Sequence, residues 1–467
     1  MTYTRDDLSL DDDIVAIATP LVPSAIAVIR TSGPRSIDRV ARVFSRHAVL
    51  TGAAGNTMVH GWIQSELGER VDEVVLGVWK HPASFTGQDA VEVFCHGGVA
   101  VVQAVFKLLL SAGFRQAERG EFTLRSYLAG KIDLTQAEAI AEIIDGKTRD
   151  EAMMAASRLS GSVSECCEHV RKLVMDTLTR VEVEVEYPED EDNFVSSVDL
   201  SSLHEAKSIL DQLSSSWQLA RIYQDGVRVV LCGKSNAGKS TLFNALLKQE
   251  RAITSARAGT TRDWIESQAD FAGVPVQLFD TAGFRDTAEA VEIEGQDRTR
   301  QLVSSSDIVV YVVDKSVGLK DDEFDYLKAL RDQGLRIVLA ANKCDIAQDR
   351  MILIPRSDQM WDALANVSAK TGAGVSSLSD TVARLALGDG ASAQHTVALG
   401  SERQKQCIDE AAAYLSHALA VTQDHTLGLD AVAQDLDDAI CALTTITGEV
   451  TSDDILKSVF SRFCVGK

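Results

Sequence analysis

The residues that indicate chemistry most directly form a short run of glycine, serine and lysine in the middle of the chain. The run from Gly233 to Ser240 directly follows the apolar segment Val227 to Cys232 and fits the pattern G-x-x-x-x-G-K-[ST]. In such a loop, consecutive backbone N–H groups point at phosphate oxygens, Lys239 neutralises their charge and the Ser240 hydroxyl can complete a Mg²⁺ shell. The run therefore predicts a nucleotide site. The expected phosphate contacts are Asn236, Ala237, Gly238, Lys239, Ser240 and Thr241.

Three later motifs predict that the nucleotide is GTP. In the first, Asp280 follows an apolar run, where its carboxylate can bind Mg²⁺ through water and the N–H of Gly283 can sense a γ-phosphate. The second motif, Asn342 to Asp345, ends in a carboxylate that can accept hydrogen bonds from the guanine N1–H and the guanine 2-amino group. Adenine lacks this pair of donors. The third motif, Ser368 to Lys370, can offer a backbone N–H to the guanine carbonyl oxygen. Each motif alone is an acceptable turn, but their order along the chain favours GTP. The predicted contacts are Asp280, Thr281, Ala282, Gly283, Asn342, Lys343, Asp345, Ser368, Ala369 and Lys370.

The chain lacks the glutamine that many GTPases place after the first of these motifs to orient the attacking water. Phe284 occupies that position, and the phosphate loop has no arginine placed to act as a finger. Positive charge between the phosphates and a polar group for water must therefore come from elsewhere. Asn236 is a candidate ligand for a monovalent cation, with a turn-stabilising asparagine as the alternative. A carboxylate in the segment Glu289 to Glu294, just beyond Gly283, is a candidate for positioning water.

The loop from Thr254 to Asp263 offers further oxygens for a cation, and Thr261 is expected to bind Mg²⁺ when a γ-phosphate is present. The alternative is an ordinary surface loop. The predicted GTP contacts in this loop are Ser255, Ala256, Arg257, Ala258, Gly259, Thr260 and Thr261.

The elements around these motifs predict an α/β domain. From about residue 227 to residue 387, short apolar β runs alternate with helical segments, which indicates a mostly parallel sheet with helices on both faces. The predicted strands are Val227 to Cys232, Pro275 to Phe279, Ile308 to Val313, Ile337 to Ala341 and Asn366 to Ser368.

The flanking segments predict two further domains, in keeping with about three units for 467 residues. The first 129 residues combine strand-like runs with the helix-length run Val99 to Leu110, which indicates an α+β domain. Val181 to Glu186 alternates like a strand, but it continues a helical stretch and ends before Pro188, so we predict a helix. Ser401 to Arg462 is helical and too thin for its own core, so the nucleotide domain is predicted to be inserted into one helical domain. The predicted segments are 1–129, 130–224, 225–388 and 389–467.

Charge and composition limit the partners. The net charge of −22 argues against broad, charge-driven nucleic-acid binding, so an RNA would be held by a restricted surface or by a second protein. The longest apolar run, Ile14 to Ile29, is broken by two prolines and preceded by three aspartates, which is wrong for a signal peptide. We therefore expect a cytoplasmic protein without a membrane partner. The eight cysteines show neither zinc spacing nor a disulfide framework.

Several motifs together resemble known families. Asn236, the run Gly259 to Asp263 and the run Asp280 to Arg285 resemble the potassium-dependent GTPases. The flanks extend the resemblance over essentially the whole chain, to the MnmE (TrmE) family of tRNA-modification GTPases. The flanking motifs are Ser84 to Asp89, Glu92, His96 to Gly98, Gly120 to Arg125, Gly130 to Ile140 and Phe463 to Lys467.

The resemblance implies a multidomain fold with an α+β N-terminal folate-binding domain that dimerises, a discontinuous all-α helical domain and an inserted α/β P-loop G domain. It implies GTP hydrolysis driven by pairing of G domains. The implied reaction adds an aminomethyl or carboxymethylaminomethyl group to carbon 5 of the wobble uridine of certain tRNAs. The implied partners are a second copy of the chain and MnmG, a flavin (FAD) protein, in a heterotetramer or larger complex. The implied one-carbon source is a tetrahydrofolate in its 5-formyl or methylene form.

The resemblance also assigns residues. Lys239, Asn236 and Glu292 become catalytic, with Glu292 positioning water, and Mg²⁺ falls to Ser240 and Thr261. The implied K⁺ ligands are Asn236, Ser255, the Arg257 carbonyl and Thr260, and the implied folate contacts are Arg30, Glu92, Lys131 and Lys467.

Basic residues can pair with the glutamate tail of a folate and a carboxylate with its amide-like pterin edge, while a solvated charge is the alternative for Arg30 or Lys131. The resemblance places Cys464 near the folate and substrate, where a buried structural thiol, a reactive thiol and a metal ligand all stay open. The run Leu21 to Ala25 departs from the family's glycine-rich loop. An alternative function is a GTP-switched RNA-binding or ribosome-assembly factor without modification chemistry.

Overall fold

The computed structural model describes residues 11–186, 200–249, 266–281, 301–346, 360–388, 397–423 and 428–467. The chain divides into two compact units, and each contains one six-stranded sheet. The first unit comprises residues 1–141, 159–210 and 406–467, and the second comprises residues 142–158 and 211–405. Within the described residues, no helix is both long and apolar enough to cross a membrane.

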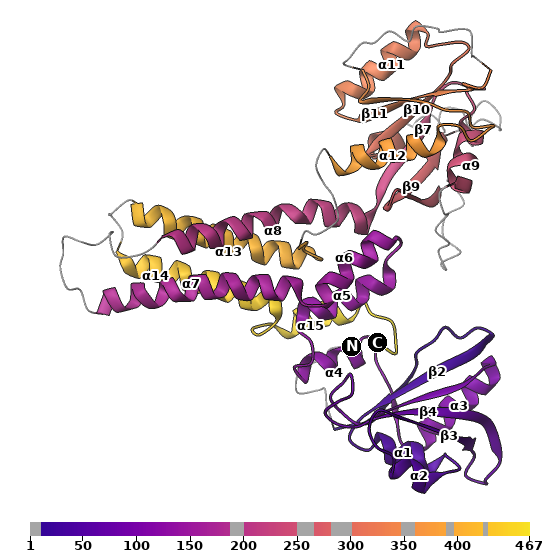
Figure 1. The fold of residues 1–467 in the computed structure, drawn as a ribbon, viewed down its shortest axis with the longest axis vertical. Helices are drawn as coiled ribbons and strands as arrows, with labels where there is room; N and C mark the ends of the chain where they lie inside the picture. The colour runs from indigo at the N-terminus through magenta and orange to yellow at the C-terminus, as the bar shows by residue number, and fades with distance from the viewer. Residues whose placement is uncertain are drawn as a thin grey trace. The chain divides into compact units, whose positions relative to one another are not determined.

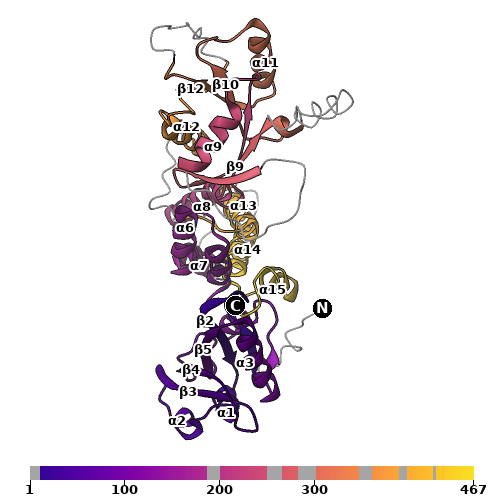
Figure 2. The same cartoon turned by 90° about the vertical axis from the view of Figure 1, so that its right-hand side faces the viewer.

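The first unit begins with a sheet in the order β3-β4-β5-β2-β1-β6, antiparallel except where β1 pairs with β6. Helix α3 covers one face of the sheet, because Val102, Val105 and Leu109 join the buried side chains of the strands (Figure 2). The predicted α+β domain is therefore confirmed. Its elements are β1 (Ile14–Ile17), β2 (Ser24–Ser32), α1 (Ser36–Arg42), α2 (His47–Thr51), β3 (Thr57–Gln64), β4 (Arg70–Trp79), β5 (Ala90–Gly97), α3 (Val99–Ser111), β6 (Arg115–Gln116) and α4 (Glu121–Leu128).

The opposite face of this sheet carries exposed side chains. Strand residues alternate between the two faces, so Ile26, Met58, His60 and His96 lie on the side away from α3. Ile26 and Met58 are 61% and 69% exposed. Apolar side chains on an open sheet face are a common feature of surfaces that bind another protein.

The helical part of the first unit packs around both ends of the chain. Helices α7 (Ser162–Glu186) and α14 (Leu429–Thr447) run side by side (Figure 1). The alternating run at 181–186 is the last part of α7, so the predicted helix is confirmed. A smaller core joins Leu124 and Leu134 to Phe460 and Phe463, which brings the C-terminal segment against the N-terminal domain. The other helices are α5 (Leu134–Asp145), α8 (Ser201–Asp225), α13 (Glu402–Gln423) and α15 (Asp453–Phe460), of which α5, α8 and α13 continue into the second unit.

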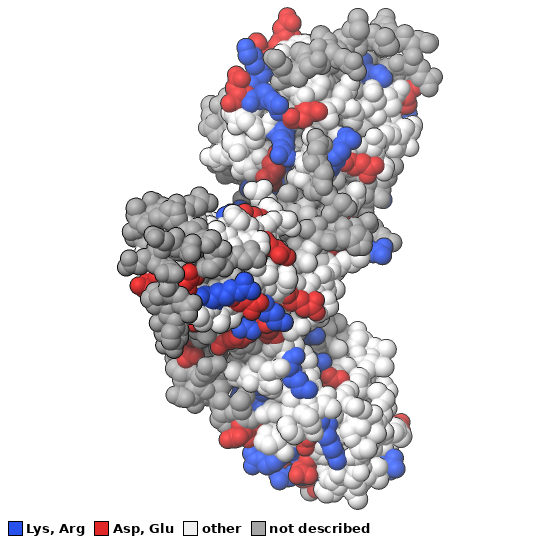
Figure 3. All heavy atoms as spheres, turned by 60° about the vertical axis from the view of Figure 1, so that its left-hand side comes forward, with Lys and Arg blue, Asp and Glu red and all other residues white. Residues whose placement is uncertain are grey.

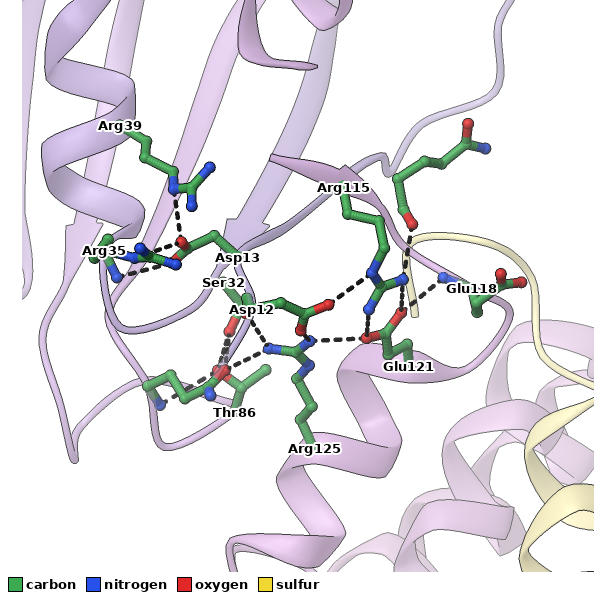
Figure 4. A network of polar contacts seen from close by, with 12 residues as sticks. Asp12, Asp13, Ser32, Arg35, Arg39, Thr86, Arg115, Glu118, Glu121 and Arg125 are labelled. Atoms are coloured by element: carbon green, nitrogen blue, oxygen red, sulfur yellow. Dashed lines mark hydrogen bonds and ion pairs between the residues drawn. The ribbon is translucent and has the colours of Figure 1, made fainter. Parts of the chain in front are cut away.

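A buried ion network connects α4 with the start of β1 (Figure 4). The Arg125 guanidinium is 3% exposed and donates to Glu121, at 2.8 Å, and to Asp12. Arg115 donates to the same two carboxylates at 2.7 Å. Burial alone would raise the pKa of Glu121, but its hydrogen bonds with Arg115 and the Glu118 N–H bring that pKa below its usual value.

Replacing Arg125 with methionine should destabilise the first unit by about 3 kcal/mol, because a buried carboxylate loses a partner. Urea unfolding at pH 7 measures this cost. The folded-state pKa of Glu121 is depressed, so its stabilisation is present above its unfolded-state pKa and is lost as the pH falls through the folded-state value. The destabilisation caused by Arg125→Met should therefore be smaller at acidic pH. Arg171→Met removes a partly exposed ion pair with Glu168 in the same unit and should cost about 0.5 kcal/mol or less; equal costs for the two variants would contradict the prediction.

The second unit contains a sheet in the order β12-β11-β10-β7-β9-β8, parallel except at β8. Two hydrophobic clusters lie against it, one including residues of α9 and α12 and the other residues of α11. The predicted mostly parallel sheet is confirmed. Its elements are β7 (Val227–Cys232), α9 (Lys239–Gln249), β8 (Glu266–Phe271), β9 (Val274–Asp280), β10 (Ile308–Asp314), α11 (Asp321–Asp332), β11 (Arg336–Asn342), β12 (Ala363–Asn366) and α12 (Val375–Leu387).

The last strand differs from the prediction. It was expected over Asn366 to Ser368, but β12 ends at Asn366, where that residue pairs with Ala341. Residues 367 and 368 have left the strand, because Ser368 donates its N–H to the carbonyl of Ala373 in a loop. The predicted strand therefore began three residues too late and ended two residues too late.

Helix α6 (Arg149–Leu159) contacts the nucleotide domain. Met154 belongs to the same hydrophobic cluster as Tyr223 and Phe271. Arg158 is buried, pairs with Glu142 and donates to the Ala398 carbonyl. The α6 segment thus belongs to the second compact unit, while the predicted domain boundaries at 129, 224 and 388 stay predictions.

Candidate functional site

The phosphate loop follows β7 and ends where α9 begins. Gly233 and Gly238 adopt positive φ angles of 137° and 93°. A Cβ on Gly233 would lie 2.2 Å from the Val312 carbonyl oxygen, and one on Gly238 would lie 2.3 Å from the Asn342 amide nitrogen. Only glycine fits at these two positions, so the loop is a close-fitting backbone cradle.

Lys239 is buried in this cradle and 7% exposed. Its Nζ donates to the carbonyl oxygens of Gly233 and Lys234, both at 3.0 Å, so the ammonium group lies within the curve of the loop. The N-terminus of α9 adds the partial positive charge of the helix dipole. The loop is therefore suited to hold phosphate oxygens.

Of the residues expected to hold Mg²⁺, Asp280 is the last residue of β9 and Ser240 is the second residue of α9, whereas Thr261 lies outside the described residues. Asp280 is 4% exposed and pairs with Leu231 of β7, directly before the phosphate loop. Thr281 donates its hydroxyl to the Leu231 carbonyl at 2.8 Å. Ser240 is exposed, so its hydroxyl and the Asp280 carboxylate offer the oxygen donors that Mg²⁺ prefers.

Asn236 lies at the tip of the loop in a left-handed conformation, with φ 63°. The Lys343 Nζ donates to the Asn236 carbonyl at 2.9 Å and to Asp314 at 2.7 Å. Burial would raise the pKa of Asp314, but the hydrogen bonds from Lys343 and Ser316 bring it below its usual value. The Asp314 carboxylate therefore fixes Lys343, which in turn fixes the backbone at Asn236.

The guanine motifs meet at the same edge of the sheet. Asn342 donates to the Ala237 carbonyl at 2.8 Å and accepts from the Ala369 N–H at 3.0 Å. Ser368 donates to Asp345 at 2.7 Å, which orients that carboxylate. The exposed Lys370 follows directly. The structure thus brings the phosphate loop and both base motifs together.

The structure does not test the other predicted residues of this site. They lie outside the described residues and are Ser255, Ala256, Arg257, Ala258, Gly259, Thr260, Thr261, Ala282, Gly283 and Glu292. Asp314 is a site residue that the sequence reasoning missed. The sequence signal that could have indicated Asp314 is its position directly after the apolar run Ile308 to Val313. Asp280 likewise directly follows the apolar run of its own strand.

The close approach of the Asn342 amide to Gly238 leads to a prediction about GTP binding. Gly238→Ala should weaken GTP binding about tenfold or more, because the new Cβ meets the Asn342 amide that holds the loop. Gly334→Ala is the matched control, since Gly334 also has a positive φ, of 80°, but no atom would lie within 4 Å of its Cβ. Titration with a fluorescent GTP analogue measures both. Equal affinities in the two variants would show that the contact is unimportant.

A second pocket lies in the first unit, on the open side of the sheet. It has a volume of about 240 Å³ and includes Arg30, Glu92, Trp79, Phe85 and Phe122 in its lining. Arg30 donates to Glu92 at 2.7 Å and to the Gly466 carbonyl at 3.2 Å. The pocket thus combines aromatic walls with one basic and one acidic group.

The C-terminal tail lies beside this pocket. The Phe122 N–H donates to the Lys467 carbonyl at 3.2 Å. Burial and the nearby charge of Arg30 lower the pKa of Lys467, whereas Glu92 raises it. Three of the four predicted folate residues are thus brought together, although they are 437 positions apart in the sequence.

Lys131 and Cys464 have different surroundings. Lys131 lines a separate open groove of about 480 Å³ with Tyr127, Asp133 and Glu449. Cys464 is exposed, so the interpretation as a buried structural thiol is wrong. A reactive role for this thiol stays a prediction.

The phosphate cradle, the strand-end Asp280 and the paired guanine motifs on a mostly parallel sheet define a P-loop GTPase. Models of two protein domains match this chain: "GTP-binding protein TrmE N-terminus" at residues 13–131 and "MnmE helical domain" at residues 134–464, a span that includes the GTP motifs. The chain belongs to the MnmE (TrmE) family.

Relatives of similar length agree with this. The tRNA modification GTPase MnmE of Treponema denticola is 40% identical over 98% of this chain and 99% of its own length. The protein of the same name from Borrelia recurrentis is 39% identical over 98% of each chain. Among solved structures, Aquifex aeolicus Era bound to GDP.AlF4- covers 40% of this chain and 66% of its own, at 22% identity and a TM-score of 0.29.

Proposed function

We propose that this protein hydrolyses GTP to drive the modification of tRNA, as the names of its relatives indicate for them. The geometry supports the GTP-hydrolysing part of this proposal. The cradle around Lys239 can bind phosphates, and Ser368 orients the Asp345 carboxylate that would recognise guanine. Ser240 and Thr261 would hold Mg²⁺ together with the phosphates, while Asp280 acts through water.

We also propose that a potassium ion activates the hydrolysis. Asn236, Ser255, the Arg257 carbonyl and Thr260 would hold it, and of these only Asn236 is described. When bound, K⁺ supplies the positive charge that an arginine finger supplies in other GTPases. Asn236 supports the proposal, because Lys343 fixes its backbone where the loop turns past the phosphates. Glu292 would position the attacking water.

We further propose that the tRNA modification uses a folate, which would bind in the pocket lined by Arg30 and Glu92. Glu92 can accept from the amide-like edge of a pterin, Trp79 and Phe85 can contact its ring, and Arg30 and Lys467 can pair with its glutamate carboxylates. Lys131 would meet the outer part of the ligand. The tetrahydrofolate, in its 5-formyl or methylene form, supplies a one-carbon unit when bound.

The same sheet face supports a homodimer in which the N-terminal domains pair. The pocket opens on the side that also exposes Ile26 and Met58, so a second copy would cover apolar surface and close the pocket. A flavin-containing partner of the MnmG type would supply redox chemistry. The complex would modify carbon 5 of the wobble uridine in the cytoplasm.

Glu292→Ala tests the hydrolytic part of the proposal. We expect GTP affinity to stay within about twofold and single-turnover hydrolysis to fall about 100-fold, since the residue would orient water and not bind GTP. Glu289→Ala, three residues earlier, is the control and should keep the full rate. Unchanged hydrolysis in Glu292→Ala would assign water positioning to another residue.

A further inference from the structure

Two arginines lie at the C-terminal tail, and neither has an ion pair among the residues that the structure describes. Arg119 forms an isolated antiparallel bridge with Val465, and Arg462 lies two residues before Cys464. Both arginines are exposed. Within the described part of the chain, neither guanidinium has an ion pair or a side-chain hydrogen bond. They are therefore available to a ligand outside the chain.

The other arginines near the tail are already paired. Arg115 and Arg125 share Glu121 and Asp12 in the buried network (Figure 4), and Arg30 pairs with Glu92. These contacts also occupy the nearby carboxylates Glu92 and Glu121. Glu118, next to Arg119 in the sequence, is the exposed carboxylate on this segment. Among the described residues, Arg119 and Arg462 therefore supply unpaired positive charge at the tail, with Lys467 at the pocket.

The fold holds these two arginines close to the pocket. Residues opposite one another in an antiparallel bridge have Cα atoms about 5 Å apart, so Arg119 lies beside Val465. Phe463 is buried in the core with Phe460 and Leu124, which anchors the tail directly after Arg462. Lys467 then reaches Phe122, which lines the pocket. A ligand that contacts both arginines would lie along the tail beside the exposed Cys464.

We propose that Arg119 and Arg462 bind backbone phosphates of the tRNA and thereby bring its target nucleotide to the Arg30–Glu92 pocket. The inference rests on the proposed function, since it takes tRNA as the substrate. A guanidinium binds phosphate oxygens in a forked geometry and releases counterions from the nucleic acid.

A restricted surface of this kind suits a chain with a net charge of −22. On the face drawn in Figure 3, acidic and basic side chains are interspersed, so no broad positive field covers that face. Local contacts beside the pocket explain how an acidic protein can still hold RNA.

The test measures RNA affinity in the full-length protein. A fluorescein-labelled 17-nucleotide anticodon stem-loop with uridine at the wobble position, and an intact tRNA, are titrated by anisotropy from 50 to 200 mM KCl. Arg119→Gln and Arg462→Gln should each weaken binding about threefold, and the double variant about tenfold. Each substitution should reduce the slope of log affinity against log salt by about 0.7 to 0.9.

Arg42→Gln is the matched control. Arg42 is also exposed and has no partner among the described residues, but it lies on α1, which both views place away from the C-terminus within this domain (Figures 1 and 2). It should bind RNA like wild type. GTP hydrolysis and affinity for 5-formyltetrahydrofolate should stay unchanged in all variants, and so should the melting temperature.

The outcomes separate the two proposals. Wild-type affinity and salt slope in the double variant would overturn the phosphate contacts while leaving tRNA as a substrate. Weakened folate binding with unchanged RNA binding would assign the arginines to the folate instead. If the wild-type protein bound neither RNA at 50 mM KCl, both the tRNA contact and the proposed direct action on tRNA would fail.

Discussion

Replacing Asn236 with alanine is expected to lower potassium-stimulated GTP hydrolysis on the order of 10³-fold and to remove the difference between potassium and sodium. The physical reason is that Phe284 cannot orient water and the phosphate loop offers no arginine, so positive charge between the phosphates must come from elsewhere, and we propose a bound cation as its source. Among the proposed ligands of that cation, Asn236 is the one that lies within the described residues. Steady-state hydrolysis in matched potassium and sodium chloride measures the effect.

Two controls separate loss of the amide from backbone strain. Alanine at a φ of 63° is strained, whereas Asn236→Gly removes the amide and keeps the left-handed conformation at little cost. Both variants should lose the potassium response. Asn56→Gly changes another left-handed asparagine, with φ 59°, and should keep full activity. A potassium response that survives in Asn236→Gly would contradict the role of the side chain.

Glu92→Ala should abolish tRNA modification and weaken binding of 5-formyltetrahydrofolate roughly 100- to 1000-fold, while GTP hydrolysis stays intact. The variant removes the carboxylate that would pair with the pterin and leaves Arg30 without its 2.7 Å partner in a half-buried pocket. Calorimetric titration with the folate measures the affinity. Nucleoside analysis of tRNA from a complemented deletion strain measures the modification.

Glu73→Ala is the control for Glu92. Like Glu92, Glu73 lies on the open face of the N-terminal sheet, away from α3, and it pairs with His60 at 3.0 Å. It is not among the residues that line the pocket. It should bind the folate like wild type. If both variants lost the folate equally, the effect would arise from the sheet as a whole. If neither lost it, the Arg30–Glu92 pocket would not be the folate site.

Two strands beside the GTP motifs, β7 and β10, could be predicted from the sequence, because each is a largely apolar run whose side chains are mostly buried. The runs at 227–232 and 308–313 are found as β7 and β10. Strand β3 was not predicted, since Met58, His60 and Gly61 do not form such a run and a neighbouring strand stabilises them. The end of β12 was misplaced because its pairing with β11 sets the boundary and local pattern does not.

The site was only partly predictable. The GTP motifs are local, so their spacing revealed them. The bond from Lys343 to Asp314 joins residues 29 positions apart, and no local pattern indicates it. The pocket around Arg30 and Glu92 was predicted only through the family resemblance, because isolated charges are ordinarily solvated. The same limit applies to α6, whose helical pattern gave no sign that Met154 packs against the nucleotide domain.

The most direct test of the central claim is the nucleoside composition of tRNA from a strain that lacks this gene. If the protein drives modification of the wobble uridine with GTP, nucleosides modified at carbon 5 should disappear from the affected tRNAs and return when the wild-type gene is restored. Unchanged wobble uridines together with defective ribosomes would contradict the claim and favour a GTP-switched ribosome-assembly factor.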